Sequence, residues 1–258
     1  MHKDKNKIND YLKLLFKTYP KKRPILSKKL KKIFKKEYKS NRDNQFVSIF
    51  ESWLHKSITK KNKNKSCKTL ELGAGTLNHI PYENDDPKHL YDIIEPKQYL
   101  FKKNKLKKRV NKVYKNYIKV PDKFYDRIIS IATLEHMTNL PEFLATSAFK
   151  LKGVKSFHSH SIPCEGYFAW NLANRVLSGL IFKIKTGCNY DELMNHEHVN
   201  NYDEIIKTIR FFYKNVKIKL SYPLYFSPHF SFYSNIYFSR PNYSNCKKYI
   251  LGQKKFKR

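Results

Sequence analysis

The stretch Lys68-Thr-Leu-Glu71-Leu-Gly73-Ala-Gly75-Thr76-Leu-Asn78-His79 decides the fold of this chain. A short apolar run carries an acidic residue, two glycines follow in a Gly-x-Gly pattern, and the chain then turns polar. In an open α/β sheet, ligands bind at the carboxyl ends of the strands, where a strand passes into the next helix. Glycine suits such a turn because a side chain would keep the backbone away from a ligand and from positive φ. The stretch therefore predicts a first strand that ends in a ligand-binding turn.

A second acidic strand end lies one βα unit further along the chain. Residues 90–96 read LYDIIEP, an apolar run that ends in Glu95 and Pro96. Folds of this kind place the acid that binds a ribose at about this distance from the glycine turn. The two acids and the turn together predict a nucleoside-binding site.

The spacing of the turn separates the candidate nucleosides. A dinucleotide fingerprint reads G-x-G-x-x-G, and its third glycine position holds Asn78 here. Glu71 precedes the turn, where its carboxylate would repel a pyrophosphate. The same carboxylate suits a ligand that carries an ammonium and a sulfonium.

This arrangement resembles motif I of the class I S-adenosylmethionine-dependent methyltransferases, E/D-x-G-x-G. Leu134-Glu135-His136, after a run at 126–132, resembles the small-molecule and glycan-modifying branch. The resemblance covers roughly residues 66–240 and departs at Leu77, where the family has a third glycine. It implies an α/β fold with a doubly wound, Rossmann-like sheet of seven mostly parallel strands. An antiparallel edge pair and an N-terminal helical extension complete the expected fold.

The resemblance implies S-adenosyl-L-methionine as the cofactor. Glu71 is expected at its amino group, Glu95 at its ribose hydroxyls, and residues 116–118 at the adenine edge. The full expected cofactor set is Glu71, Gly73, Gly75, Thr76, Asn78, Glu95, Pro96, Ala132, Leu134 and Glu135.

Histidines supply the candidates for the acceptor side, because a hydroxyl acceptor must lose its proton and histidine titrates near neutral pH. His136 and His160 are the candidate catalytic residues, each with a structural alternative as a capping or packing residue. The candidate substrate contacts are His158, Ser161, His196 and His198. The His-x-His pair at 196 and 198 could bind a metal, but no third ligand has a clear spacing, so no metal is expected.

The chain is strongly basic, with 53 lysines and arginines against 21 acids among 258 residues and a net charge of +32. Such a field attracts polyanions: nucleic acid, anionic lipid or an acidic glycan. The sequence at 24–38 places Leu26, Leu30, Ile33, Phe34 and Tyr38 on one helical face among lysines. This stripe predicts packing on the main domain; contact with an anionic membrane or with nucleic acid are the alternatives.

Composition and periodicity, together with the extent of the resemblance, divide the chain into three regions. Residues 1–65 form a basic helical extension, residues 66–240 the main domain with a helical insertion at 164–209, and residues 241–258 a basic tail expected to be loose. Strands are expected at about 68–72, 90–94, 110–114, 126–132, 154–162, 215–222 and 230–239.

Several function classes are disfavoured. The sequence has no run of 18 apolar residues, no apolar signal segment and no Cys-x-x-Cys pair, which fits a cytoplasmic protein. Enzymes that methylate the exocyclic amines of nucleic-acid bases carry an Asn/Asp-Pro-Pro-aromatic motif, which is absent here. RNA cytosine-C5 methyltransferases carry a second cysteine after the fourth strand, and this sequence has none there to accompany Cys164 after the fifth. The sequence therefore predicts methyl transfer to a hydroxyl or carboxylate of a small molecule or glycan, in surface-polysaccharide assembly. RNA methylation and a non-catalytic binding protein are the alternatives.

Overall fold

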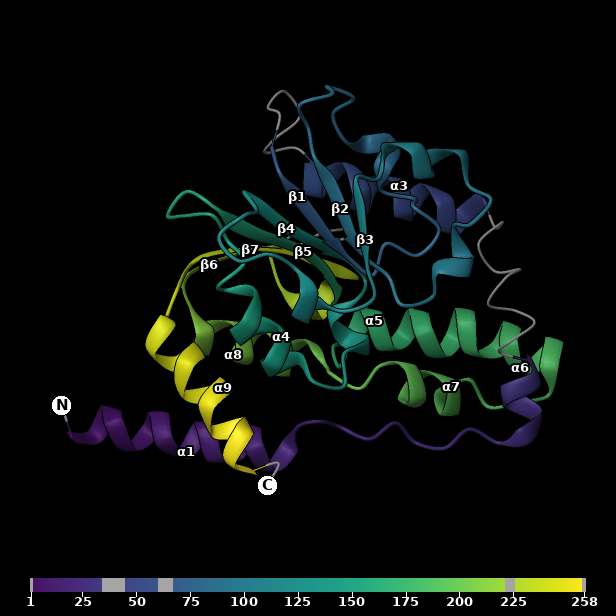
Figure 1. The fold of residues 1–258 in the computed structure, drawn as a ribbon. Coiled ribbons are helices and arrows are strands. Elements are labelled where there is room, and N and C mark those ends of the chain that lie inside the picture. The colour runs from purple at the N-terminus through teal and green to yellow at the C-terminus, as the bar shows by residue number, and fades with distance from the viewer. Residues whose placement is uncertain (1, 34–44, 60–66, 221–225, 257–258) are drawn as a thin grey trace.

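The computed structural model describes residues 2–33, 45–59, 67–220 and 226–256. Seven strands form one sheet in the order β3-β2-β1-β4-β5-β7-β6 (Figure 1). Their bounds are β1 Thr69–Leu72, β2 Tyr91–Ile94, β3 Lys112–Tyr114, β4 Arg127–Ile131, β5 Phe157–Pro163, β6 Tyr213–Leu220 and β7 Tyr233–Pro241. The predicted strands and their order along the chain are confirmed.

The first five strands run parallel, and the last two form an antiparallel pair at one edge. β1 lies between β2 and β4, with Leu72 opposite Ile94 and Glu71 opposite Ile129. β7 pairs with β5 in the opposite direction, and β6 pairs with β7. The carboxyl ends of β1, β2 and β4 therefore meet at the same edge of the sheet.

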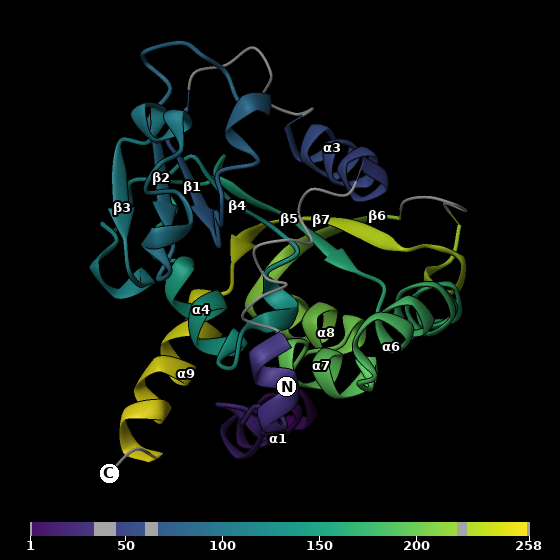
Figure 2. The ribbon, with the colours of Figure 1, turned by 90° about the vertical axis from the view of Figure 1, so that its right-hand side faces the viewer.

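Helices cover both faces of this sheet (Figure 2). α3 (Gln45–Thr59) covers one face, over β4 and β5. α4 (Leu140–Ser147), α8 (Tyr202–Phe212) and α9 (Tyr243–Phe256) pack together on the other, and α1 (His2–Thr18) lies against α9. This is the expected doubly wound α/β fold with an N-terminal helical extension.

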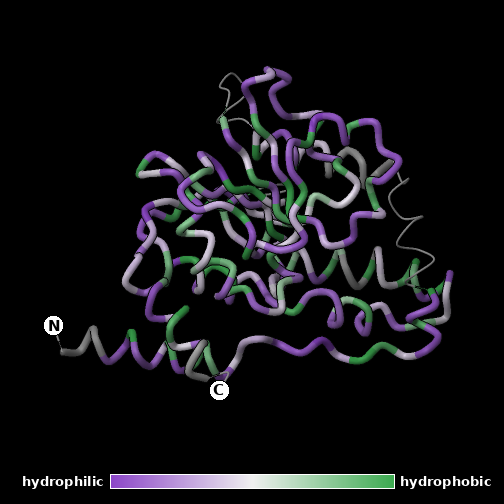
Figure 3. The backbone as a smooth tube through the Cα atoms, in the orientation of Figure 1, coloured by the Kyte–Doolittle hydropathy of each residue, from purple (hydrophilic) through white to green (hydrophobic). Residues whose placement is uncertain are grey.

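The core follows the apolar pattern of the sequence. All four residues of both β1 and β2 are buried, because a central parallel strand is covered on both faces. Figure 3 shows apolar segments along the strands of the sheet. α8 begins with a capping box between Asn201 and Glu204 and buries Ile205, Ile209 and Phe212.

The connections that follow β1 and β2 are short 3-10 turns rather than α-helices. Ile80–Tyr82, Gln98–Leu100 and Lys105–Arg109 are the turns in these two connections. Pro81 and Pro87 interrupt the first connection, and proline removes a helical hydrogen bond.

The C-terminal segment differs from the expected loose tail. Residues 243–256 form α9, which buries Cys246 and Tyr249 against α4 and α8. Cys246, Tyr249 and Gln253 recur at helical spacing, a stripe that the abundance of lysine obscures in the sequence.

The stripe at 24–38 is described as far as residue 33. Leu26 and Leu30 are buried with Phe182, so the predicted packing is confirmed for these two residues. Phe34 and Tyr38 lie outside the described residues.

A second apolar stripe lies exposed on the helical insertion. The segment comprises α5 (Phe168–Leu172), a π-helix at Ala173–Gly179 and α6 (Leu180–Thr186). Its exposed members, each half exposed or more, are Phe168, Leu172, Val176, Leu180, Ile181 and Ile184. We call them the insertion stripe. Within the described residues, no helix is both long and apolar enough to cross a membrane.

Candidate functional site

The turn after β1 adopts the backbone that glycine favours. Gly73, Gly75 and Leu77 have φ of 71°, 54° and 68°. A Cβ at Gly73 would lie 2.7 Å from the Thr133 side chain, too close for an unstrained contact. Leu77, where the resemblance expects a third glycine, keeps the left-handed conformation and is fully buried.

Glu95 is held against this turn by two backbone donors. The Gly75 N–H donates to its Oε2 at 2.9 Å, and the Lys97 N–H donates to its Oε1 at 2.8 Å. Glu95 is 6% exposed at the end of β2. Both carboxylate oxygens are therefore fixed, and each retains a lone pair for a ligand.

A cavity of about 600 Å³ lies at the carboxyl ends of β1, β2 and β4. Eight of the ten predicted cofactor residues line it: Glu71, Gly73, Gly75, Thr76, Asn78, Glu95, Pro96 and Ala132. Asn116 and Tyr117 also line it, whereas Ile118 does not.

Leu134 and Glu135 do not line the cavity, contrary to the prediction. Leu134 is fully buried in the main hydrophobic core, and Glu135 is 1% exposed behind the cavity wall. Both lie in the 3-10 turn Leu134–His136 after β4, and only His136 of that turn reaches the cavity. Thr133, which the sequence analysis did not single out, lines the cavity beside the glycine turn.

Glu71 connects the cavity to a buried polar network. The Tyr91 hydroxyl donates to its Oε2 at 2.8 Å, and burial raises the pKa of Glu71. Beneath it, His79 Nε2 lies 2.6 Å from Glu83 Oε1, and Glu83 also pairs with Arg127. Although burial opposes ionisation, these partners hold the pKa of Glu83 well below its usual range. Glu83 and Arg127 belong to no local motif, so this network could not be predicted from the sequence.

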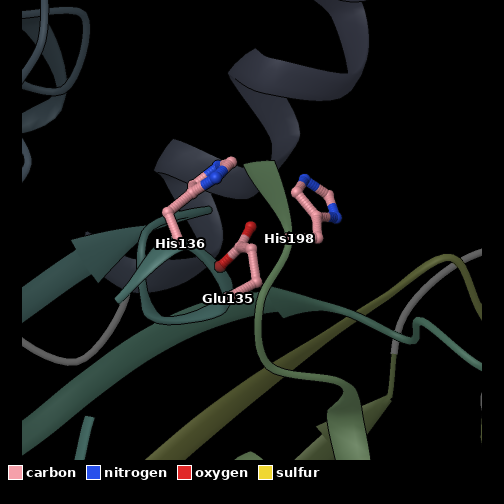
Figure 4. A group of neighbouring side chains, drawn as sticks. All are labelled: Glu135, His136 and His198. Atoms are coloured by element: carbon pink, nitrogen blue, oxygen red, sulfur yellow. The ribbon is translucent and has the colours of Figure 1, made fainter. Parts of the chain in front are cut away.

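His136 and His198 meet at the cavity wall, and the Glu135 carboxylate lies beside their rings (Figure 4). The ring centroids of the two histidines lie 4.7 Å apart at an interplanar angle of 79°. His136 Nδ1 lies 2.9 Å from the Glu197 carbonyl oxygen. Burial and the nearby His198 lower the pKa of His136 to about 3, so its imidazole is neutral at pH 7.

Two acids, Glu165 and Glu135, lie close to His198. His198 Nδ1 lies 2.7 Å from Glu165 Oε2. Burial alone would lower the pKa of His198, but this hydrogen bond and the nearby carboxylates raise it. Burial raises the pKa of Glu135 to about 7.

Long-range hydrogen bonds from three side chains position this group. Asn200 Nδ2 donates to the carbonyls of Leu134 and Met137 at 3.0 and 2.7 Å, which ties the turn after β4 to the segment before α8. The Tyr19 hydroxyl donates to Asn200 Oδ1 at 3.0 Å. The Arg23 guanidinium donates to the carbonyls of His136 and His196, each at 2.6 Å. The N-terminal segment therefore braces the site, and Arg23 itself lines the cavity.

The predicted residues of β5 lie elsewhere. His158, His160 and Ser161 are fully buried and do not line the cavity. His160 lies 2.6 Å from Ser130 Oγ and 3.1 Å from His158, which in turn lies 3.0 Å from the Tyr213 hydroxyl. The three residues therefore do not reach the cavity, and the contacts of the two histidines are those of the packing alternative. His158 and His160 face Phe143 of α4, whereas the cavity lies at the carboxyl edge of the sheet.

His196 also points away from the cavity. Its Nδ1 lies 2.5 Å from the Pro24 carbonyl oxygen, so it joins the N-terminal segment to α7 (Tyr190–Glu197). Of the predicted acceptor-side residues, His136 reaches the cavity and His198 stands directly behind it.

No protein-family model matches the sequence, and no curated protein matches it. Solved structures do match the fold. A S-adenosylmethionine-dependent methyltransferase from Thermotoga maritima, described as a possible histamine N-methyltransferase, is 14% identical with a TM-score of 0.51. The match covers 76% of this chain and 96% of that one.

Two further structures are similar to the same extent. A protein from Pyrococcus horikoshii OT3 is 12% identical with a TM-score of 0.50, covering 76% of this chain and 92% of that one. The [4+2]-cyclase SpnF is 11% identical with a TM-score of 0.50, covering 73% and 80%. At such identities the matches establish the fold alone. The chain therefore has the fold of the class I S-adenosylmethionine-dependent methyltransferases, as the sequence predicted.

Proposed function

We propose that this protein is a methyltransferase that binds S-adenosyl-L-methionine in the cavity at the carboxyl ends of β1, β2 and β4. The observation that best supports this proposal is the contact between the glycine turn and Glu95. The turn has a left-handed backbone, and its Gly75 N–H orients the Glu95 carboxylate. A nucleoside ribose needs such a fixed pair of acceptor oxygens, and Glu71 supplies a second carboxylate for an ammonium group. The cavity residues therefore fit this cofactor better than a pyrophosphate-bearing dinucleotide.

The proposed reaction is an in-line displacement at a methyl carbon. When bound, the cofactor supplies a methyl group on a positively charged sulfur. The acceptor oxygen forms a bond to that carbon as the carbon–sulfur bond breaks, and the electron pair remains on sulfur. The protein contributes mainly by alignment, which can account for about 7–11 kcal/mol of the barrier.

The acceptor side favours an oxygen acceptor that ionises easily. Neutral His136 lines the cavity and can accept a hydrogen bond or a proton from the acceptor. With a pKa lowered to about 3, it is a weak base. A carboxylate needs no proton removed, and a sugar hydroxyl needs further activation. We propose a carboxylate or hydroxyl of a small metabolite or glycan as the acceptor.

The insertion stripe supports an acceptor presented at an anionic membrane. Its six exposed apolar side chains share the segment with exposed Lys183 and Lys185, in a chain of net charge +32. Apolar side chains flanked by lysines suit the headgroup region of an anionic bilayer. Trp170, on the same segment, stacks on His198 at 6.4 Å between ring centroids, which places the segment beside the site. A glycan acceptor carried on a lipid would then lie near the cavity.

Two other functions carry less support. RNA methylation rests on the positive charge alone. The cyclase SpnF shares the fold, so a protein of this architecture need not transfer methyl groups. Under both alternatives, the carboxylates of Glu71 and Glu95 in the cavity would still favour binding of S-adenosylmethionine.

Transfer of a labelled methyl group tests the proposal. Purified protein, labelled cofactor and a native cell extract are incubated, and the labelled product is identified after fractionation. Label is expected in a small-molecule or glycan fraction, and label in the RNA fraction would instead support the RNA alternative. Absence of label in all fractions, with the cofactor bound, would support a non-catalytic role.

A further inference from the structure

We propose that Glu135, His136 and His198 form a binding site for a divalent transition-metal ion at the acceptor side of the cavity. One ligand atom from each of the three residues lies within 4.8 Å of the other two (Figure 4). The role of the ion in catalysis rests on the proposed function, whereas the evidence for the binding site does not.

The unpartnered carboxylate is the first observation that points to an ion. Glu135 is 1% exposed, and its Oε2 is buried without a hydrogen-bond partner among the described residues. A buried carboxylate that lacks a partner is costly, and such groups are usually paired or bind metals. Figure 4 shows this carboxylate beside the two imidazole rings.

The orientation of the two histidines is the second observation. Each ring is anchored through Nδ1, His136 to the Glu197 carbonyl oxygen at 2.9 Å and His198 to the Glu165 carboxylate at 2.7 Å. Oxygen partners at one ring nitrogen fix the ring and direct the other nitrogen to a metal, as in many metal–histidine–carboxylate sites. The Nε2 atoms are therefore the expected ligands.

The local charge supports a cation. Glu135, Glu165 and Glu197 converge on the two rings, in a chain with only 21 acids against 53 basic residues. Arg23 lies 3.7 Å from Glu197 and offsets one of these charges. The remaining carboxylates leave the group suited to a positive ion.

The donor set indicates the class of ion. Two imidazoles and one carboxylate suit zinc, iron, cobalt, nickel or manganese, whereas magnesium and calcium prefer oxygen ligands alone. A four-coordinate ion holds its ligand atoms about 3.4 Å apart, at bonds of about 2.1 Å, so these side chains would move together by about 1 Å. Three protein ligands leave at least one position open.

The open position gives the ion a use in the proposed reaction. His136 lines the cavity, so an ion bound to it would lie at the cavity wall. An acceptor hydroxyl bound to such an ion would have a lower pKa and would release its proton to water at the open side of the site. His136 would then act on the acceptor through the ion rather than as a free base.

Cobalt titration tests the site without relying on activity. The full-length protein is stripped with a chelator and titrated with Co²⁺, whose visible absorption reports its ligands, and Zn²⁺ is then added in competition. The wild-type protein is expected to bind one equivalent of Co²⁺ that Zn²⁺ displaces. Glu135→Gln and His198→Asn are each expected to lower the affinity by more than about tenfold.

His196→Asn is the matched control, because His196 lies two residues from His198 but bonds Pro24. It is expected to bind Co²⁺ like the wild type. Melting curves of every variant verify the fold, and His136→Asn provides a further ligand variant if one of the others does not fold. The proposal is overturned if the wild type shows no Co²⁺ absorption, or if folded Glu135→Gln and His198→Asn bind Co²⁺ as tightly as the control. Calorimetry with S-adenosylmethionine on the same samples separates this failure from failure of the proposed function.

Discussion

The turn after β1 requires glycine at position 73. Two independent features exclude a side chain at this position. Its φ of 71° is one that residues with a Cβ rarely adopt, and a Cβ would lie 2.7 Å from the Thr133 side chain. Leu77 reaches a similar φ with a side chain, because it is buried in the core and its neighbours determine its conformation. A glycine motif therefore indicates the turn, but its absence at one position does not exclude the same backbone.

Gly73→Val is expected to abolish binding of S-adenosylmethionine, because the turn must shift away from Thr133. Gly153→Val is the matched control, since its Cβ would meet no atom within 4 Å. Calorimetry measures both. Adding Thr133→Ala to a Gly73→Ala variant should restore part of the affinity, because it removes the nearest atoms, whereas the backbone strain of roughly 1–2 kcal/mol remains. Unchanged affinity in Gly73→Val would show that the turn is not part of the cavity wall that contacts the ligand.

β5 shows why an alternation of side chains does not by itself locate a site. His158 and His160 share one face of the strand, as the sequence predicted, but that face is the core face. Which face of a central strand meets the cavity depends on the neighbouring strands and helices. The sequence of β5 alone holds no information on it.

The buried histidines predict a loss of stability in acid. Burial lowers the pKa of His160 to about 3, so the folded state keeps it neutral while the unfolded chain takes up a proton below about pH 6.5. Its contribution is present above pH 6.5 and is lost as the pH falls, by about 2 kcal/mol at pH 5.

Chemical denaturation at pH 7 and pH 5 measures this loss. A His160→Gln variant is expected to lose less stability between the two pH values than the wild type does. His229→Gln, in the turn Pro228–Phe230 outside the core, serves as the control and should follow the wild type. Parallel pH profiles for wild type and His160→Gln would contradict the buried, neutral assignment.

α9 shows how composition can conceal an element. Its lysines and the chain end suggested a loose tail, but Tyr249 is fully buried and stacks on Phe16 of α1 with 5.1 Å between ring centroids. Tyr249→Ala is expected to lower the free energy of unfolding by about 3 kcal/mol, close to the cost of other large core truncations. Tyr243→Ala, at a side chain 45% exposed, should cost far less. Equal melting temperatures for both variants would mean that α9 does not pack as described.

At the scale of the whole molecule, the charge and the insertion stripe support the proposed binding to an anionic membrane. Replacing Leu172, Leu180 and Ile184 with serine should reduce flotation with anionic vesicles and leave the melting temperature unchanged, because these side chains are exposed. Leu30→Ser is the contrasting variant. It should lower stability by roughly 1–3 kcal/mol, because Leu30 is fully buried.

Flotation at low and high salt completes that comparison, since the lysine contribution weakens with salt and the apolar contribution does not. Equal flotation of the triple variant and the wild type would remove the membrane proposal.

The sheet and the part of the cavity formed by the glycine turn and Glu95 were predictable, because apolar strands, a glycine turn and acidic strand ends leave local patterns. The acceptor side was not. His136 and His198 are 62 positions apart in the sequence, and their meeting depends on Asn200, Arg23 and Tyr19, whose long-range hydrogen bonds have no sequence signature. The Glu83–Arg127 pair beneath Glu71 was hidden for the same reason.

The central claim is that Glu95 and the glycine turn hold S-adenosylmethionine, and calorimetric titration of that cofactor tests it most directly. The wild-type protein is expected to bind one equivalent. Glu95→Ala should lose most of this affinity, because it removes the acceptor oxygens for the ribose and frees the Gly75 N–H. Asp10→Ala, at an exposed acid in α1, should bind like the wild type. Absence of binding to the wild type, or unchanged affinity in a folded Glu95→Ala protein, would contradict the account.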